Sequence, residues 1–156
     1  MVSLGFMKGV KRMAKVLAVC ISLKKGEQKK EIPFAECVVD FGIKGDAHGG
    51  NWHRQISLLA KESVDEMRAR GLTLINGDFA ENIVTEGIDL KGLPVGTRLL
   101  VGSEVVLEVT QIGKECHSGC VIMQKAGKCV MPTDGIFAKV IVGGVVKGDD
   151  EIRVGA

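Results

Sequence analysis

Three of the five cysteines lie within the stretch KECHSGCVIMQKAGKCVMP, residues 114–132. Cys116 is followed directly by His117, and Cys120 and Cys129 complete the group. Thiols at this density can hold a metal ion, form a disulfide, or present one thiolate for chemistry. We expect a cytoplasmic protein, and thiols in that compartment stay reduced. A disulfide framework is therefore not expected.

A structural zinc site needs four ligands, usually as two short pairs with a loop between them. Cys116 and Cys120 form a CxxxC pair, but Cys129 has no second cysteine beside it. It would have to act with His117, whose neighbour Cys116 competes for the same geometry. The spacing disfavours zinc, and we expect none.

A redox pair is usually CxxC at a helix N-terminus, which a CxxxC flanked by strands fits poorly. The remaining interpretation is one thiolate that serves as a soft metal ligand or as a sulfur carrier. Lys114 lies two residues before Cys116, and a nearby cation stabilises a thiolate.

A second polar cluster lies in the glycine-rich stretch KGDAHGGNWHRQ, residues 44–55. It contains two of the three histidines and the only tryptophan, as Asp46, His48, Trp52, His53 and Arg54. Backbone N–H groups beside histidine and arginine suit an anionic ligand. An ordinary surface loop remains an equal alternative. The stretch has no GxGxxG or P-loop spacing, so no nucleotide fingerprint applies.

A third cluster is NGDFAEN, residues 76–82, with Asp78, Glu81 and Asn82. These side chains can bind a ligand or act as acid and base. They can equally form a turn and a strand start by bonding to their own backbone, and that alternative is favoured.

The elements that position these clusters are mostly strands. Apolar runs broken by glycine predict a mainly β fold, a closed barrel or a sandwich, with one or a few short helices. KESVDEMRARG, residues 61–71, is the clearest helix, with Gly71 suited to its C′ position. Cys20 and Cys37 lie in apolar runs and are expected in the core. The expected strands are residues 15–23, 55–60, 97–102 and 104–113, with three more between 135 and 154; residues 24–31 read as a solvated hairpin turn.

Composition narrows the class of protein. The chain has 156 residues and a formal net charge of +2, which gives no argument for binding nucleic acid or membranes. No apolar run is long enough to span a membrane, and no cleavage site follows the apolar run near the N-terminus. We expect a cytoplasmic protein with a basic segment at 1–14 and a single domain at 15–156.

These motifs together resemble a known family. The stretch from GDFAENIVTEGIDLKG to KECHSGC, and the later GKCVMPTDGIFAKVIVGGVVKGDDEI, closely resemble the MOSC domain, named for the C-terminal part of molybdenum cofactor sulfurases. The upstream GIKGDAHGGNWHRQISLLAKES is similar to stand-alone bacterial members. The resemblance runs from about residue 15 to the end and implies a barrel-like β fold.

The resemblance also implies the molybdenum cofactor, a pterin with a phosphate and a dithiolene that holds molybdenum. In members that bind it, a cysteine is the protein's ligand to the metal. That position falls on Cys120 or Cys116, in this order, as catalytic and metal-binding residues. From residue type, we expect the phosphate to meet His48, Arg54 and the surrounding glycines, and the pterin edges to meet Asp78, Glu81 and Asn82. Lys114 is expected as a further cofactor-binding residue, beside the cysteines.

Three functions follow as expectations. The first is a protein that handles or transfers the cofactor or its sulfur through a reactive cysteine, for a client molybdoenzyme. The second is a molybdenum-dependent reductase of N-hydroxylated compounds, supplied with electrons by a separate redox partner, since the sequence has no flavin or iron–sulfur motif. The third is a small zinc or interaction module without catalysis.

Overall fold

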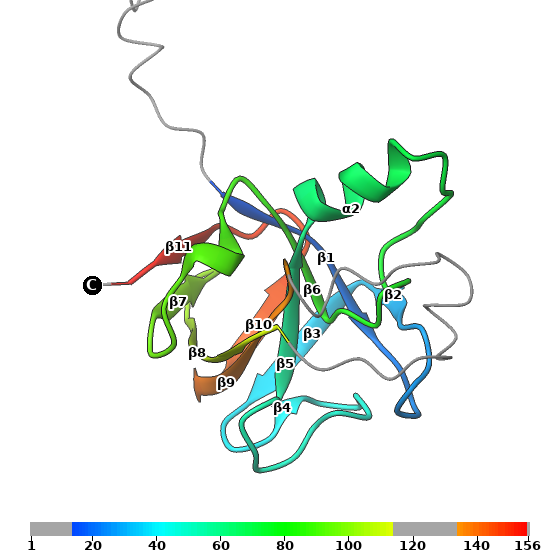
Figure 1. The fold of residues 1–156 in the computed structure, drawn as a ribbon. Helices are drawn as coiled ribbons and strands as arrows, with labels where there is room; N and C mark the ends of the chain where they lie inside the picture. The colour runs from blue at the N-terminus through cyan, green and yellow to red at the C-terminus, as the bar shows by residue number, and fades with distance from the viewer. Residues whose placement is uncertain (1–13, 114–133, 156) are drawn as a thin grey trace, which may run out of the picture.

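The computed structural model describes residues 14–113 and 134–155 (Figure 1). Eleven strands, one α-helix and one short 3-10 helix lie in these ranges. In chain order they are β1 (Lys15–Ile21), β2 (Lys30–Ile32), β3 (Phe34–Val38), β4 (Gly42–Ile43), β5 (Ile56–Ala60), α2 (Lys61–Arg68), β6 (Ile83–Glu86), η1 (Leu90–Gly92), β7 (Arg98–Val101), β8 (Val105–Ile112), β9 (Ile136–Val142), β10 (Gly144–Lys147) and β11 (Ile152–Val154).

The strands form two sheets, and the mainly β prediction is confirmed. The larger sheet has eight strands in the order β11-β7-β8-β9-β5-β6-β1-β2, and the smaller has the order β10-β3-β4. All neighbours are antiparallel except β5 and β6. The hairpin expected over residues 97–113 is present as β7–β8. The turn expected before the last strand is present, but it joins β10 of the small sheet to β11 of the large sheet and makes no hairpin.

The sequence analysis offered a closed barrel as one expectation, and the described residues do not form one. The large sheet curls until the start of β1 meets the turn before β11, through one isolated bridge between Lys15 and Glu151. The Val16 N–H donates to the Asp150 carbonyl at 2.8 Å, and the Ile152 N–H donates to the Ala14 carbonyl at 3.0 Å. These contacts are too few for a ladder, and β2 continues the sheet beyond β1.

The parallel pair β5 and β6 is joined by α2, because parallel neighbours need a crossover connection. The sequence predicted this helix over residues 61–71, but not the crossover. The helix ends at Arg68 with Ala69 as its C-cap, so Gly71, at a φ of 94°, lies one residue beyond the predicted position. Val64 and Met67 lie on the inner face of α2 and pack in one buried cluster with Leu59 of β5.

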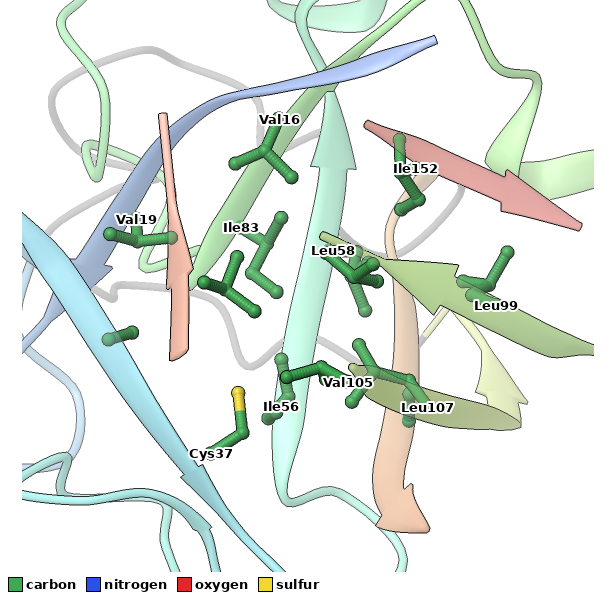
Figure 2. Packing of buried hydrophobic residues seen from close by; sticks show 14 of the residues in the cluster. Val16, Val19, Cys37, Ile56, Leu58, Ile83, Leu99, Val105, Leu107 and Ile152 are labelled. Atoms are coloured by element: carbon green, nitrogen blue, oxygen red, sulfur yellow. The ribbon is translucent and has the colours of Figure 1, made fainter. Parts of the chain in front are cut away.

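The main core lies between the curled large sheet and the small sheet (Figure 2). Strand β5 is buried along its whole length, as expected for a strand with both faces covered. Cys37 of β3 belongs to this core, and Cys20 lies in a smaller cluster on the other face of β1. Both are free thiols, as predicted. Burial raises the pKa of Cys37 to about 12 and that of Cys20 further, so both remain neutral thiols.

The Gly143–Gly144 pair does not make the hairpin turn expected from the sequence. Strand β9 pairs with β5 and β8, whereas β10 pairs with β3. The two glycines therefore carry the chain from one sheet to the other. No helix in the described part of the chain is long and apolar enough to cross a membrane.

Candidate functional site

The loop of residues 44–55 is ordered around one buried carboxylate, that of Asp46. Its Oδ1 accepts the Ser22 N–H at 3.1 Å and the Lys29 ammonium at 2.7 Å. Its Oδ2 accepts the His48 N–H at 3.2 Å. Both side chains of the Lys29–Asp46 pair have no exposed surface. A buried charge of this kind is tolerated because it is paired and hydrogen-bonded.

Lys29 is the residue at this site that the sequence reasoning missed. The lysine-rich stretch at residues 24–31 predicted a solvated turn, and its neighbours Lys24, Lys25 and Lys30 are indeed exposed. Lys29 instead turns inward, and its ammonium contacts the Ser22 hydroxyl at 3.0 Å, Asp46 at 2.7 Å and the His48 Nδ1 at 2.9 Å. Only the tertiary pairing with Asp46, 17 residues away, distinguishes it from its neighbours.

The Arg54 guanidinium contacts two aromatic rings. Its guanidinium carbon is 4.9 Å from the centroid of Trp52 and 5.6 Å from that of Phe137. Its Nε is buried and has no hydrogen-bond partner among the described residues. Trp52 is itself fixed, because its indole N–H donates to the His48 carbonyl at 2.8 Å, and the Lys25 ammonium lies 5.2 Å from its ring. A planar cation held this way, with an unused donor, is suited to an anion.

The same loop contacts the base of the cysteine-bearing segment. The His53 Nε2 lies 3.0 Å from the Gln111 Oε1, and the Thr110 hydroxyl donates to the His53 carbonyl. Gln111 donates to the Gly113 carbonyl, and the Gly113 N–H donates to the Gly135 carbonyl at 2.7 Å. The two ends from which residues 114–133 start and finish are therefore held together, beside the loop that carries Arg54.

The predicted residues Lys114, Cys116 and Cys120 lie outside the described residues, as do His117 and Cys129. The order of Cys120 before Cys116 stays a prediction. Within the described ranges no group of three histidine, cysteine or acidic side chains could hold a metal ion.

The third cluster, residues 76–82, forms a turn closed by its own side chains. The Glu81 carboxylate accepts the N–H groups of Gly77 at 2.9 Å and of Phe79 at 3.0 Å. The Asp78 Oδ2 accepts the Ile75 N–H at 3.0 Å. Asp78 and Glu81 are almost fully buried. Their hydrogen bonds match the alternative in which these residues bond to their own backbone.

Asn82 joins three strands. Its side-chain oxygen accepts the Ser57 N–H of β5 at 2.9 Å, and its amide donates to the Cys20 carbonyl of β1 at 3.0 Å. Its backbone N–H donates to the Ser57 hydroxyl. Asn82 thus fixes the start of β6 between its two neighbours, and the side chain uses both its acceptor and its donor on protein groups.

The turn at 76–82 also holds Lys29 in place. The Lys29 N–H donates to the Gly77 carbonyl at 2.8 Å. A Cβ built on Gly77, whose φ is 93°, would lie 2.0 Å from the Lys29 carbonyl oxygen. Only glycine permits this approach. Lys29 therefore connects the second and third clusters. Its side chain contacts the loop of residues 44–55, and its backbone packs against the turn of residues 76–82.

Burial raises the pKa of Glu81 to about 7, against the opposing effect of the backbone N–H groups that it accepts. Between about pH 4.5 and pH 7, Glu81 is therefore protonated in the folded protein but ionised in the unfolded chain. We expect this group to lower the free energy of unfolding by roughly 3 kcal/mol at most as the pH rises through that window.

Urea unfolding at about pH 5 and about pH 8 tests this, with Glu81→Gln as the comparison. The variant stays neutral, so its free energy of unfolding should fall less between the two pH values than that of the wild type. Equal falls in both proteins would show that Glu81 is already ionised at the lower pH.

Comparisons with known proteins agree with this architecture. The MOSC domain family matches residues 44–153, which include both polar clusters. The fold is similar to that of the YuaD protein from Bacillus subtilis, with a TM-score of 0.71 and 21% identity over 92% of this chain and 96% of that chain.

Two YiiM structures are also similar. YiiM from Geobacillus stearothermophilus has a TM-score of 0.67 and 14% identity over 92% of this chain and 75% of that one. YiiM from Escherichia coli has a TM-score of 0.66 and 16% identity over 93% of this chain and 71% of that one. A comparison with curated proteins gives no match. From the family match over residues 44–153, the chain belongs to the MOSC domain family.

Proposed function

We propose that this MOSC protein binds the molybdenum cofactor and hands the cofactor, or its sulfur, to a client molybdoenzyme in the cytoplasm. One observation carries the proposal. The Arg54 guanidinium lies against the rings of Trp52 and Phe137, and its buried Nε has no partner among the described residues. A buried donor without a partner is costly, and an anionic ligand would remove that cost.

The residues around Arg54 fit the phosphate of such a cofactor. The guanidinium offers a planar set of donors that matches phosphate oxygens, and the stacked rings restrict its rotation. His48 lies in the same loop, and the Lys25 ammonium lies on the Trp52 ring. Lys114 follows Gly113 directly in sequence and is proposed as a further cation for the phosphate.

When bound, the cofactor supplies a metal centre that prefers soft sulfur ligands. The chain would contribute the thiolate of Cys120, or of Cys116 as the second choice, from the segment whose two ends are joined at Gly113 and Gly135. The neutral, buried Cys20 and Cys37 are poor candidates for that role.

Asp78, Glu81 and Asn82 receive a supporting role in this proposal. Their side chains hold the turn that backs Lys29 and the start of β6. A pterin edge that competed for Glu81 or Asn82 would have to replace hydrogen bonds that the fold itself uses. We therefore propose that they act on the cofactor through the position of Lys29 and His48.

Anaerobic reconstitution of the full chain with molybdenum cofactor tests the function. Molybdenum content and the fluorescence of the released pterin are measured after gel filtration, for the wild type, Cys120→Ser and Cys116→Ser. We expect near-stoichiometric cofactor on the wild type and a large loss with Cys120→Ser. Wild-type protein without molybdenum or pterin, or stoichiometric zinc bound through the cysteines, would refute the proposal.

A further inference from the structure

We propose that Lys29 is a positioning residue that fixes His48 as a neutral imidazole with its proton on Nε2. His48 would then donate this Nε2–H to an anionic oxygen of the ligand. The inference deepens the proposed function and rests on it for the identity of the ligand, but the protonation of His48 follows from the contacts of the protein alone.

The first step is the charge of Lys29. Its Nζ lies 2.7 Å from the Asp46 Oδ1, a distance typical of an ammonium and a carboxylate. The same Nζ lies 3.0 Å from the Ser22 hydroxyl and 2.9 Å from the His48 Nδ1. An ammonium has three N–H donors and no acceptor, so Lys29 can only be the donor in each of these contacts.

The second step is that each of the three partners must accept. The Ser22 hydroxyl donates its own proton to the Lys24 carbonyl at 3.0 Å, so its oxygen is able to accept from Lys29. The carboxylate of Asp46 accepts by nature. The His48 Nδ1 faces a group that only donates, so it must carry a lone pair rather than a proton. A neutral imidazole then carries its proton on Nε2.

The third step excludes the competing arrangement. A proton on the His48 Nδ1 would point at the Lys29 ammonium, and the Asp46 Oδ2 is 3.9 Å from this nitrogen. That distance is too long for a hydrogen bond. The Oδ2 instead accepts the His48 backbone N–H at 3.2 Å. Asp46 therefore holds the backbone of His48, while Lys29 holds its ring.

The ring of His48 keeps a partly exposed surface, with 26% of the side chain accessible. The His48 carbonyl also receives the indole N–H of Trp52, whose ring stacks on Arg54. One residue thus connects the buried Lys29–Asp46 pair to the aromatic ring beside Arg54. A neutral N–H donor and a permanent cation in one loop form a set suited to phosphate oxygens.

The test is a long-range proton–nitrogen NMR spectrum of the cofactor-free full chain with labelled histidine, at about pH 8, where imidazoles are neutral. The His48 signals are assigned by their loss in His48→Gln. We expect a single form with the proton on Nε2 and a hydrogen-bonded Nδ1. A proton on Nδ1, or nitrogen shifts averaged over both forms, would overturn the inference.

Lys29→Met shows whether Lys29 sets this state, and Lys30→Met is the matched control, because Lys30 is the exposed neighbour in β2. We expect the His48 Nδ1 shift to change in Lys29→Met and to stay in Lys30→Met. An unchanged shift in Lys29→Met would remove the positioning role. If that variant does not fold, Lys29→Arg, which keeps the charge and alters the geometry, is judged by the same shift.

Inorganic phosphate then probes the donor role, with sodium chloride at equal ionic strength as the control. Phosphate should shift the His48 Nε2–H signal, and chloride should not. Equal responses to both salts would refute donation to an anion. These spectra need no cofactor, so a failed reconstitution would count against the proposed function and leave the protonation of His48 standing.

Discussion

Replacing Arg54 by alanine is expected to weaken binding of the molybdenum cofactor by about 10- to 100-fold, the loss of roughly 1.5–3 kcal/mol from charge-assisted hydrogen bonds to an anion. The guanidinium contacts the rings of Trp52 and Phe137, and its buried Nε has no partner among the described residues. The dissociation constant is measured by anaerobic titration with the cofactor, followed through the emission of Trp52.

Two further variants make this result specific. Arg54→Lys keeps the charge but loses the planar donors and the stacking, so its affinity should lie between those of the wild type and Arg54→Ala. Arg98→Ala removes an exposed arginine of β7 that pairs with Glu108, and should bind as the wild type does. Equal affinity of Arg54→Ala and Arg98→Ala would take Arg54 out of the site.

Replacing Gly77 by alanine is expected to lower the free energy of unfolding by roughly 2–5 kcal/mol, from a left-handed backbone and an overpacked contact together. The added Cβ would lie 2.0 Å from the Lys29 carbonyl oxygen, which is backbone and has little room to move. Chemical unfolding followed by circular dichroism measures the loss.

Gly71→Ala is the matched control for this prediction. Gly71 has nearly the same backbone angle, a φ of 94° against 93° for Gly77, but nothing lies within 4 Å of its added Cβ. It should lose only the conformational cost, about 1–2 kcal/mol. The difference between the two variants isolates the contact with Lys29. Equal losses of unfolding free energy in the two variants would mean that the turn at 76–82 makes no close contact with Lys29.

The strands could be predicted from sequence because their signal is local. Apolar runs located β1, β5, β7 and β8 to within a few residues, and three strands were expected in the region 135–154 that holds β9, β10 and β11. What the sequence did not show is long-range pairing. The shift from one sheet to the other at Gly143–Gly144, and the crossover through α2, depend on which strands meet.

The same distinction between local signals and long-range contacts applies to the residues of the site. The chemical types of His48 and Arg54 marked them as candidates, and the structure places both in one loop tied together by Trp52. Lys29 could not be distinguished from the lysines around it, because only its partner Asp46, distant in sequence, makes its burial favourable. For Asp78, Glu81 and Asn82 the sequence left two alternatives, and their hydrogen bonds to backbone groups favour the supporting one.

The central claim is that the molybdenum cofactor binds against the stacked pair of Arg54 and Trp52. Since Trp52 is the only tryptophan of the chain, its emission reports on this place alone. Titration of the wild-type protein with intact cofactor under nitrogen should give a saturable change in Trp52 emission at one equivalent. Cofactor that co-elutes with the protein while Trp52 emission stays constant would contradict the account.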